Sequence, residues 1–153
     1  MNIEIPEGYR QFPITEGFAD HAGPLYTKVV DGKGSLGVRV LPHHANPVGI
    51  CHGGVMMTLM DMAIGQAIML ANPDAPFVPS INLTFDFLKP GKLGEWLYSE
   101  VDFVHSTRRM GFANGVLFGS DGPILRCNGI CKIPRSNDPT FGQHLRILQA
   151  PTE

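Results

Sequence analysis

The chain has 153 residues, and its 12 Lys and Arg residues against 14 Asp and Glu residues give a formal net charge of −2. This length is typical of one domain, and a hydrophobic content of 43% is enough to build a sizeable core. The near-neutral charge and the absence of a basic stretch argue against a nucleic-acid partner, and the composition argues against a disordered chain.

The first predicted elements are two strands, residues 25–30 and 35–41, with a glycine-containing turn between them. Residues 32–37 also match the GxGxxG pattern of dinucleotide-binding loops. That pattern requires a helix after it, whereas the strand-like sequence VRVLP follows here. We therefore interpret residues 31–34 as a hairpin turn. The first 20 and the last 20 residues are less regular, and we expect loops with short helical turns in both.

Residues 54–72 predict one long helix that is apolar on nearly every side, with Asp61 as its only charged residue. The segment is almost long enough to cross a membrane. The charge near its centre and the lack of flanking Lys or Arg clusters argue against that, and we expect no membrane contact. A helix this apolar is buried on most sides, so we expect it to contact a partner subunit or a ligand as well as its own sheet.

Four more strands are predicted after the helix. In the first of them, residues 81–88, apolar and polar side chains alternate with a period of two. The other three are residues 95–105, 111–119 and 124–133. The order β-β-α-β-β-β-β predicts an α+β fold in which an antiparallel sheet wraps around one long central helix. We expect a single domain over residues 1–153, with its core in residues 24–133.

The three cysteines, Cys51, Cys127 and Cys131, are an odd number and form no CxxC pair. The first ten residues, MNIEIPEGYR, contain neither the basic nor the apolar region of a secretory signal. These features predict reduced thiols and a cytoplasmic protein.

Asp61 is the residue with the clearest chemical meaning. A lone carboxylate on an apolar helix is costly to bury unless it is paired or its pKa rises, so one interpretation is a structural carboxylate bonded to neighbouring groups. The other interpretation is functional. The two glycines at the helix start, Gly53 and Gly54, leave free N–H groups at the positive end of the helix, where a ligand oxygen can bind. Together, a carboxylate and an anion site form half of an acyl-transfer site.

Two other chemistries fit the sequence less well. His43, His44, His52 and Asp61 do not have the spacing of a metal site, and we expect no metal. Cys51 next to His52 suggests a thiol–imidazole pair, but adjacent side chains in an extended chain point in opposite directions.

Residues 42–67, PHHANPVGICHGGVMMTLMDMAIGQA, resemble the hotdog-fold acyl-CoA thioesterases. The most similar branch is that of the phenylacetate-degradation thioesterases and the human thioesterase superfamily proteins. Its pattern is an Asn, a Pro-x-Gly, a His-Gly-Gly and an Asp eight residues after the first of those two glycines. A Ser ten residues before the Pro of Lys-Pro-Gly also belongs to it. Here these positions are Asn46, Pro47-Val48-Gly49, His52-Gly53-Gly54, Asp61, and Ser80 before Pro90.

The resemblance implies a hotdog fold, a homodimer with a joined sheet and a homotetramer made of two dimers. Active sites of this family lie at the dimer interface, with the Asp from one subunit and the Gly-Gly helix start from the other. The implied activity is hydrolysis of an acyl-CoA or aryl-acyl-CoA to the free acid and CoA. No cofactor is needed, because CoA is part of the substrate.

The resemblance also implies a role for each matched residue. The Gly53 N–H would bind the thioester oxygen, and Asp61 would act as nucleophile or as general base, two routes that the sequence leaves open. Asn46 would position the water or the thioester, and Ser80 would orient the water. His52 would bond to the carbonyl or brace its loop.

For the CoA phosphates we consider the cationic side chains in two turns of the sheet, Lys89, Lys92, Arg108 and Arg109, although exposed charges of this kind are also ordinary in turns. Two other functions remain open. One is that of a non-catalytic hotdog protein that binds or senses acyl-CoA, and the other is that of a hydratase on the same fold. The presence of Asp61 argues against the first, and we find no His and acidic pair typical of the second.

Overall fold

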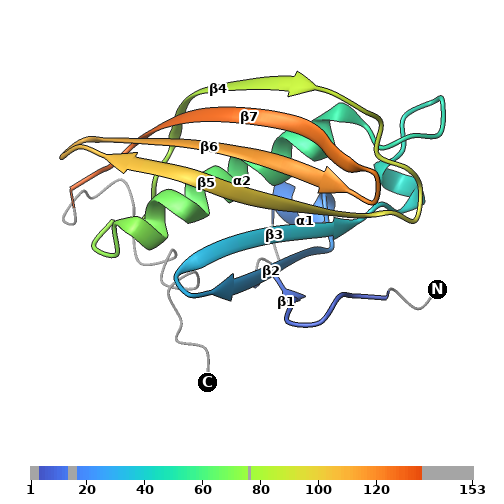
Figure 1. The fold of residues 1–153 in the computed structure, drawn as a ribbon, viewed down its shortest axis with the longest axis horizontal. Helices are drawn as coiled ribbons and strands as arrows, with labels where there is room; N and C mark the ends of the chain where they lie inside the picture. The colour runs from blue at the N-terminus through green and yellow to red at the C-terminus, as the bar shows by residue number, and fades with distance from the viewer. Residues whose placement is uncertain (1–3, 14–16, 76, 136–153) are drawn as a thin grey trace.

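The computed structural model describes residues 4–13, 17–75 and 77–135 (Figure 1). Within these residues, seven strands form one antiparallel sheet in the order β1-β2-β3-β5-β6-β7-β4. The long helix α2, Gly53–Ala71, lies against one face of the sheet, which curves around it (Figure 1). The strands are β1 Arg10–Gln11, β2 Leu25–Val30, β3 Lys33–Arg39, β4 Ser80–Phe87, β5 Trp96–Ser106, β6 Met110–Gly119 and β7 Gly122–Lys132.

This architecture confirms the predicted α+β fold, and each predicted strand and the helix lie within about two residues of their expected bounds. The short helix α1, Phe18–His21, belongs to the N-terminal part where helical turns are expected. Sequence periodicity missed the two-residue strand β1 and the 3₁₀ turn η1, Pro42–His44, because both are too short to show a repeat. The helical turns expected in the last 20 residues fall almost entirely outside the described residues.

The hairpin interpretation of the GxGxxG segment is confirmed. β2 and β3 pair residue for residue up to the Val30–Lys33 pair, and the turn between them places Asp31 at φ 50° and Gly32 at φ 75°. Positive φ at both turn residues is the signature of the tight hairpin turn whose twist matches that of the strands.

The core lies between α2 and the concave face of the sheet. Glycines on β6 and β7 let the helix approach closely, because a Cβ atom on Gly111 or Gly129 would lie 2.5 Å from the Cγ2 atom of Ile68 or Ile64. The helix residues that face the sheet are buried: Met56, Leu59, Met60, Ala63, Ile64 and Ile68.

The opposite side of α2 is only partly covered within one chain, and Met57 is 38% and Leu70 41% exposed. By length and composition alone, α2 also qualifies as a candidate membrane span, as do core helices of soluble proteins. The helix contacts β3, β4, β5, β6 and β7 on its buried side. Among the described residues, α2 is therefore fully buried only on the sheet side, and its opposite side is partly exposed at Met57 and Leu70.

Candidate active site

The start of α2 leaves one backbone donor unused. His52 is the N-cap residue in an extended conformation, with φ −64° and ψ 136°, and its Nδ1 accepts the Gly54 N–H at 2.8 Å. Its carbonyl oxygen accepts the Val55 N–H at 3.0 Å. The Gly53 N–H has no acceptor within residues 4–13, 17–75 and 77–135. In the described part of the chain, the positive end of the helix therefore offers a single free N–H, that of Gly53, to an incoming oxygen.

The structure gives the His52 side chain a structural contact, whereas the sequence left open whether it bonds to the substrate carbonyl or braces its loop. Because Nδ1 accepts a hydrogen bond, the proton of the neutral ring lies on Nε2. The imidazole thus acts as a helix cap, and it removes Gly54 from the set of available donors.

Replacing His52 with alanine should lower the free energy of unfolding by about 1 kcal/mol, the usual cost of losing a side-chain cap. Asparagine is a good N-cap residue, so His52→Asn should keep most of that stability. Urea unfolding of the two variants and the parent measures the difference. Equal losses in both variants would show that the cap is not what the imidazole contributes.

An aromatic ring lies beside the free donor. A Cβ atom on Gly53 would lie 3.2 Å from both Cε1 and Cζ of Phe87, the last residue of β4. Phe87 is 52% exposed, so the ring borders the Cα side of Gly53 while about half of the residue stays accessible. A glycine at this position therefore gives the ring its place next to the helix start.

Asp61, two turns into α2, is held by one hydrogen bond from Ser80 at the start of β4. The Ser80 hydroxyl donates to Oδ1 of Asp61 over 2.5 Å. The other carboxylate oxygen accepts no hydrogen bond from any residue that the structure describes. Asp61 is half-buried, so its free oxygen remains within reach of a substrate or a water molecule.

A β-bulge makes the contact between Ser80 and Asp61 possible. Ser80 pairs with Cys131 of β7, and Asn82 pairs with Ile130, so Ile81 is an extra residue in β4. Strict alternation would put Ser80 on the outer face with Thr84, which bonds to Asn128 there. The extra residue turns Ser80 to the inner face, towards α2.

Asn46 belongs to the loop that leads into α2. Its Oδ1 accepts the N–H groups of Val48, at 3.1 Å, and Ile50, at 3.3 Å, and so closes the Pro-x-Gly turn. Its amide nitrogen has no acceptor in the described part of the chain. Asn46 thus braces the loop with one end of its side chain and has two donor hydrogens left for a ligand.

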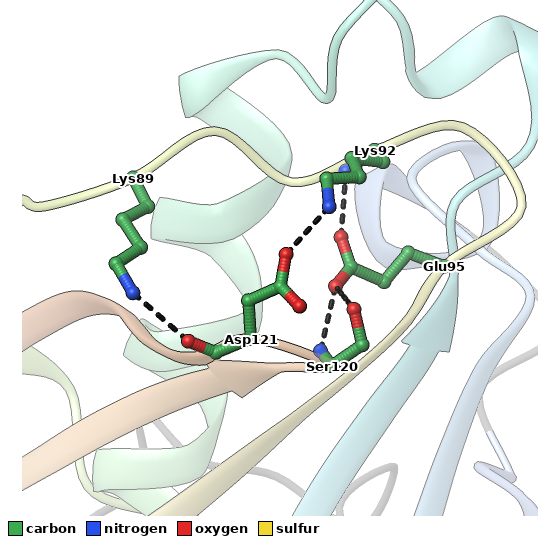
Figure 2. A network of polar contacts seen from close by, with 5 residues as sticks. All are labelled: Lys89, Lys92, Glu95, Ser120 and Asp121. Atoms are coloured by element: carbon green, nitrogen blue, oxygen red, sulfur yellow. Dashed lines mark hydrogen bonds and ion pairs between the residues drawn. The ribbon is translucent and has the colours of Figure 1, made fainter.

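Lys89 and Lys92 lie near the helix start, but both already have partners (Figure 2). Lys92 forms an ion pair with Asp121 at 2.6 Å, and Lys89 donates to the Asp121 carbonyl at 2.9 Å. The Lys92–Asp121 ion pair raises the pKa of Lys92 and lowers that of Asp121. Partial burial opposes ionisation of Glu95, yet hydrogen bonds from Lys92 and Ser120 bring its pKa below the usual range. The network joins the 89–95 loop to the β6–β7 turn.

Arg108 and Arg109 occupy the β5–β6 turn at the other end of the molecule, near the end of α2 (Figure 1). Both are exposed, and neither side chain has a hydrogen-bond or ion-pair partner among the described residues. α2 has 19 residues, so its ends are about 28 Å apart. One chain therefore does not bring the two lysines and the two arginines into one phosphate site.

Cys51 belongs to the core and not to a thiol–imidazole pair. It is 2% exposed, and burial, aided by the charge of Glu95, raises its pKa to about 11.

His43 and His44 both place Nε2 on the carbonyl oxygen of Gly23, at 2.8 and 3.0 Å. Within the described ranges, no three His, Cys, Asp or Glu side chains lie close enough together to hold a metal ion.

An antiparallel sheet curved around one long helix defines the hotdog fold, and comparisons with known proteins agree. The Thioesterase superfamily model matches residues 48–124. Relatives include a candidate esterase of Pseudomonas aeruginosa, 27% identical over 135 residues, with 86% of this chain and 99% of that protein covered. The acyl-coenzyme A thioesterase 13 of Mus musculus is 29% identical over 77 residues, 50% of this chain and 54% of that protein.

Solved structures of low identity share the fold. The zebrafish thioesterase superfamily member 2 has a TM-score of 0.67 at 23% identity, over 78% of this chain and 89% of that one. A Streptococcus pneumoniae hypothetical thioesterase with coenzyme A has a TM-score of 0.65 at 20% identity, over 72% and 89%. Because the family model covers half of the sequence, the chain belongs to the thioesterase superfamily, and it is a thioester hydrolase.

Proposed function

We propose that this protein hydrolyses acyl-CoA or aryl-acyl-CoA thioesters to a free acid and CoA, with Asp61 as the reacting carboxylate. The observation that carries the proposal is the Asp61 carboxylate, which Ser80 holds at one oxygen while the other stays free. The acyl-coenzyme A thioesterase among its relatives and the coenzyme A in a structure of the same fold support acyl-CoA as the substrate class.

We further propose that each active site is shared by two copies of the chain. Gly53 and Asp61 are eight residues apart on α2, about 12 Å along its axis, so one thioester carbon cannot contact both within one chain. Two pockets of the described chain have volumes of about 160 and 510 Å³. Neither is lined by Asn46, Gly53, Asp61 or Ser80, so neither pocket is the proposed active site.

The edge strand β4 gives such a dimer a surface. None of its residues is fully buried, and among the described strands only β7 pairs with it. An unpaired edge next to the partly exposed side of α2 favours a homodimer in which two β4 strands join the sheets. A homotetramer of two such dimers follows from the family resemblance.

Two mechanisms use the same residues. In both, the thioester oxygen accepts the Gly53 N–H, which stabilises the charge that grows on it in the transition state. As a general base, Asp61 takes a proton from water, the resulting hydroxide attacks the carbonyl carbon, the C–S bond breaks, and the proton passes from Asp61 to the departing CoA thiolate. As a nucleophile, Asp61 attacks that carbon itself, CoA leaves as a thiolate that takes up a proton, and water then hydrolyses the mixed anhydride. Asn46 positions the reacting group in either case.

Arg108 and Arg109 are proposed to bind CoA phosphates, because their guanidinium groups are exposed and without partners in the described chain, whereas the two lysines are engaged. Replacing both arginines with alanine should raise KM for acyl-CoA at least about tenfold, and should leave KM for the matching acyl-pantetheine almost unchanged. Steady-state thiol release measures both constants. Equal increases for the two substrates would place the arginines outside the phosphate site.

The function is tested by thiol release from a panel of phenylacetyl-, hydroxybenzoyl-, short-, medium- and long-chain acyl-CoAs. We expect steady turnover of at least one member. Tight acyl-CoA binding without turnover would instead indicate a binding or sensing protein. Loss of water from a 3-hydroxyacyl-CoA would indicate a hydratase.

A further inference from the structure

A buried thiol lies directly behind the Ser80 hydroxyl. Cys131 of β7 is the register partner of Ser80, and its Sγ is 3.9 Å from Ser80 Oγ. Cys131 is fully buried, whereas Ser80 is exposed on its other side. The Ser80 oxygen therefore stands between the Cys131 thiol on the core side and the Asp61 carboxylate.

A count of hydrogens fixes which atom donates in each of the two contacts of Ser80. The Ser80 hydroxyl has one hydrogen, and the 2.5 Å contact with the carboxylate of Asp61 uses it, since a carboxylate only accepts. In the contact with Cys131, Ser80 must then be the acceptor and the thiol the donor. We infer that Cys131 is a positioning residue whose S–H donates to Ser80 Oγ and so keeps the Ser80 proton on Asp61, an inference that rests on the proposed thioesterase function.

The surroundings of Cys131 keep its proton in place. Burial raises the pKa of the thiol above its usual range, and the charge of Asp61 raises it further. A thiol that stays protonated at neutral pH is a constant donor. The β-bulge at Ile81 is what sets Ser80 opposite Cys131 on the inner face, so one backbone feature aligns all three side chains.

The test compares two buried cysteines on the same face of β7. Cys131→Ala should lower kcat two- to five-fold, the range expected for a weak S–H···O bond, and leave KM unchanged. Cys131→Ser, which keeps a donor, should restore kcat. Cys127→Ala is the matched control, because Cys127 is equally buried but makes no hydrogen bond to Ser80 among the described contacts. It should leave kcat unchanged.

A double-mutant cycle then separates positioning from packing. In a Ser80→Ala background, Cys131→Ala should lower kcat no further, because the donor has lost its acceptor. Additive losses in this cycle, an equal loss in Cys127→Ala, no loss in Cys131→Ala, or no recovery in Cys131→Ser would each overturn the inference.

An infrared measurement decides the question even if the proposed function fails. The S–H stretching band that disappears in Cys131→Ala should move to higher frequency in Ser80→Ala, since an S–H bond strengthens when its acceptor is removed. An unshifted band would show that the thiol does not donate to Ser80, whatever the protein hydrolyses.

Discussion

Replacing Asp61 with asparagine lowers kcat for thioester hydrolysis by about 10²–10⁴-fold, the usual contribution of a positioned base. The amide is nearly the same size as the carboxylate, and its oxygen still accepts the Ser80 proton, so the contact with β4 survives. Asparagine neither takes a proton from water nor attacks a carbonyl carbon at a useful rate. Thiol release under saturating substrate measures the loss.

The matched control for this variant is Asp86→Asn on the outer face of β4, where the carboxylate forms an exposed ion pair with Arg126 at 2.7 Å. An exposed pair of this kind contributes little to stability, and Asp86 faces away from α2, so kcat should stay within about twofold of the parent. If Asp61→Asn also stayed within a few-fold, Asp61 would be a structural carboxylate and both proposed mechanisms would be wrong.

Replacing Gly53 with proline lowers kcat by about 10²–10³-fold, the typical effect of removing one donor to a developing oxyanion. Proline lacks the N–H, and the first helical position is where a helix tolerates proline best. The preceding residue, His52, already has the extended conformation that a following proline favours. The variant therefore removes the donor with little damage to the helix, which thermal unfolding checks.

Gly53→Ala is the steric control, because it keeps the N–H and brings a Cβ atom to 3.2 Å from Phe87. Phe87 is exposed and its ring can shift by a few tenths of an ångström, so we expect a smaller loss than in the proline variant. Equal losses in the two variants would attribute the effect to crowding instead of the missing donor.

Mixing the two inactive variants tests whether the site is shared. If Asp61 and Gly53 of different copies meet, a dimer of one Asp61→Asn and one Gly53→Pro chain contains one intact site. Random exchange should then restore about a quarter of the parental activity. Sites built within one chain would gain nothing on mixing.

Much of the fold could be predicted because its signals are periodic. The strand from Ile81 shows a clear alternation, and the long apolar run with a single Asp indicates a central helix. The grouping of Asp61 with Ser80 depended on the family resemblance, because the alternation of β4 alone puts Ser80 on the outer face. Only the paired strands show the extra residue that turns it inwards.

Other features of the site depend on partners that are distant in the sequence. The sequence gives no direction for the His52 ring, so its role as a cap became visible only with the Gly54 contact. Lys92 is a plausible phosphate ligand until Asp121, 29 residues later, is found beside it. Cys131 lies 51 residues from Ser80, and nothing in a single sequence relates the two.

The cap at the helix start also has a consequence for how the reaction ends. Helix N-termini that hold phosphate or carboxylate use several free amides at once. Here His52 occupies the Gly54 amide, which leaves one N–H, enough for the single oxygen of a carbonyl. In the proposed mechanism the acid produced carries two oxygens and a full charge, and it would face the negative Asp61 with the Gly53 N–H as the only helix donor beside the Asn46 amide. If Asp61 acts as proposed, charge repulsion between its carboxylate and the acid should favour release of the product.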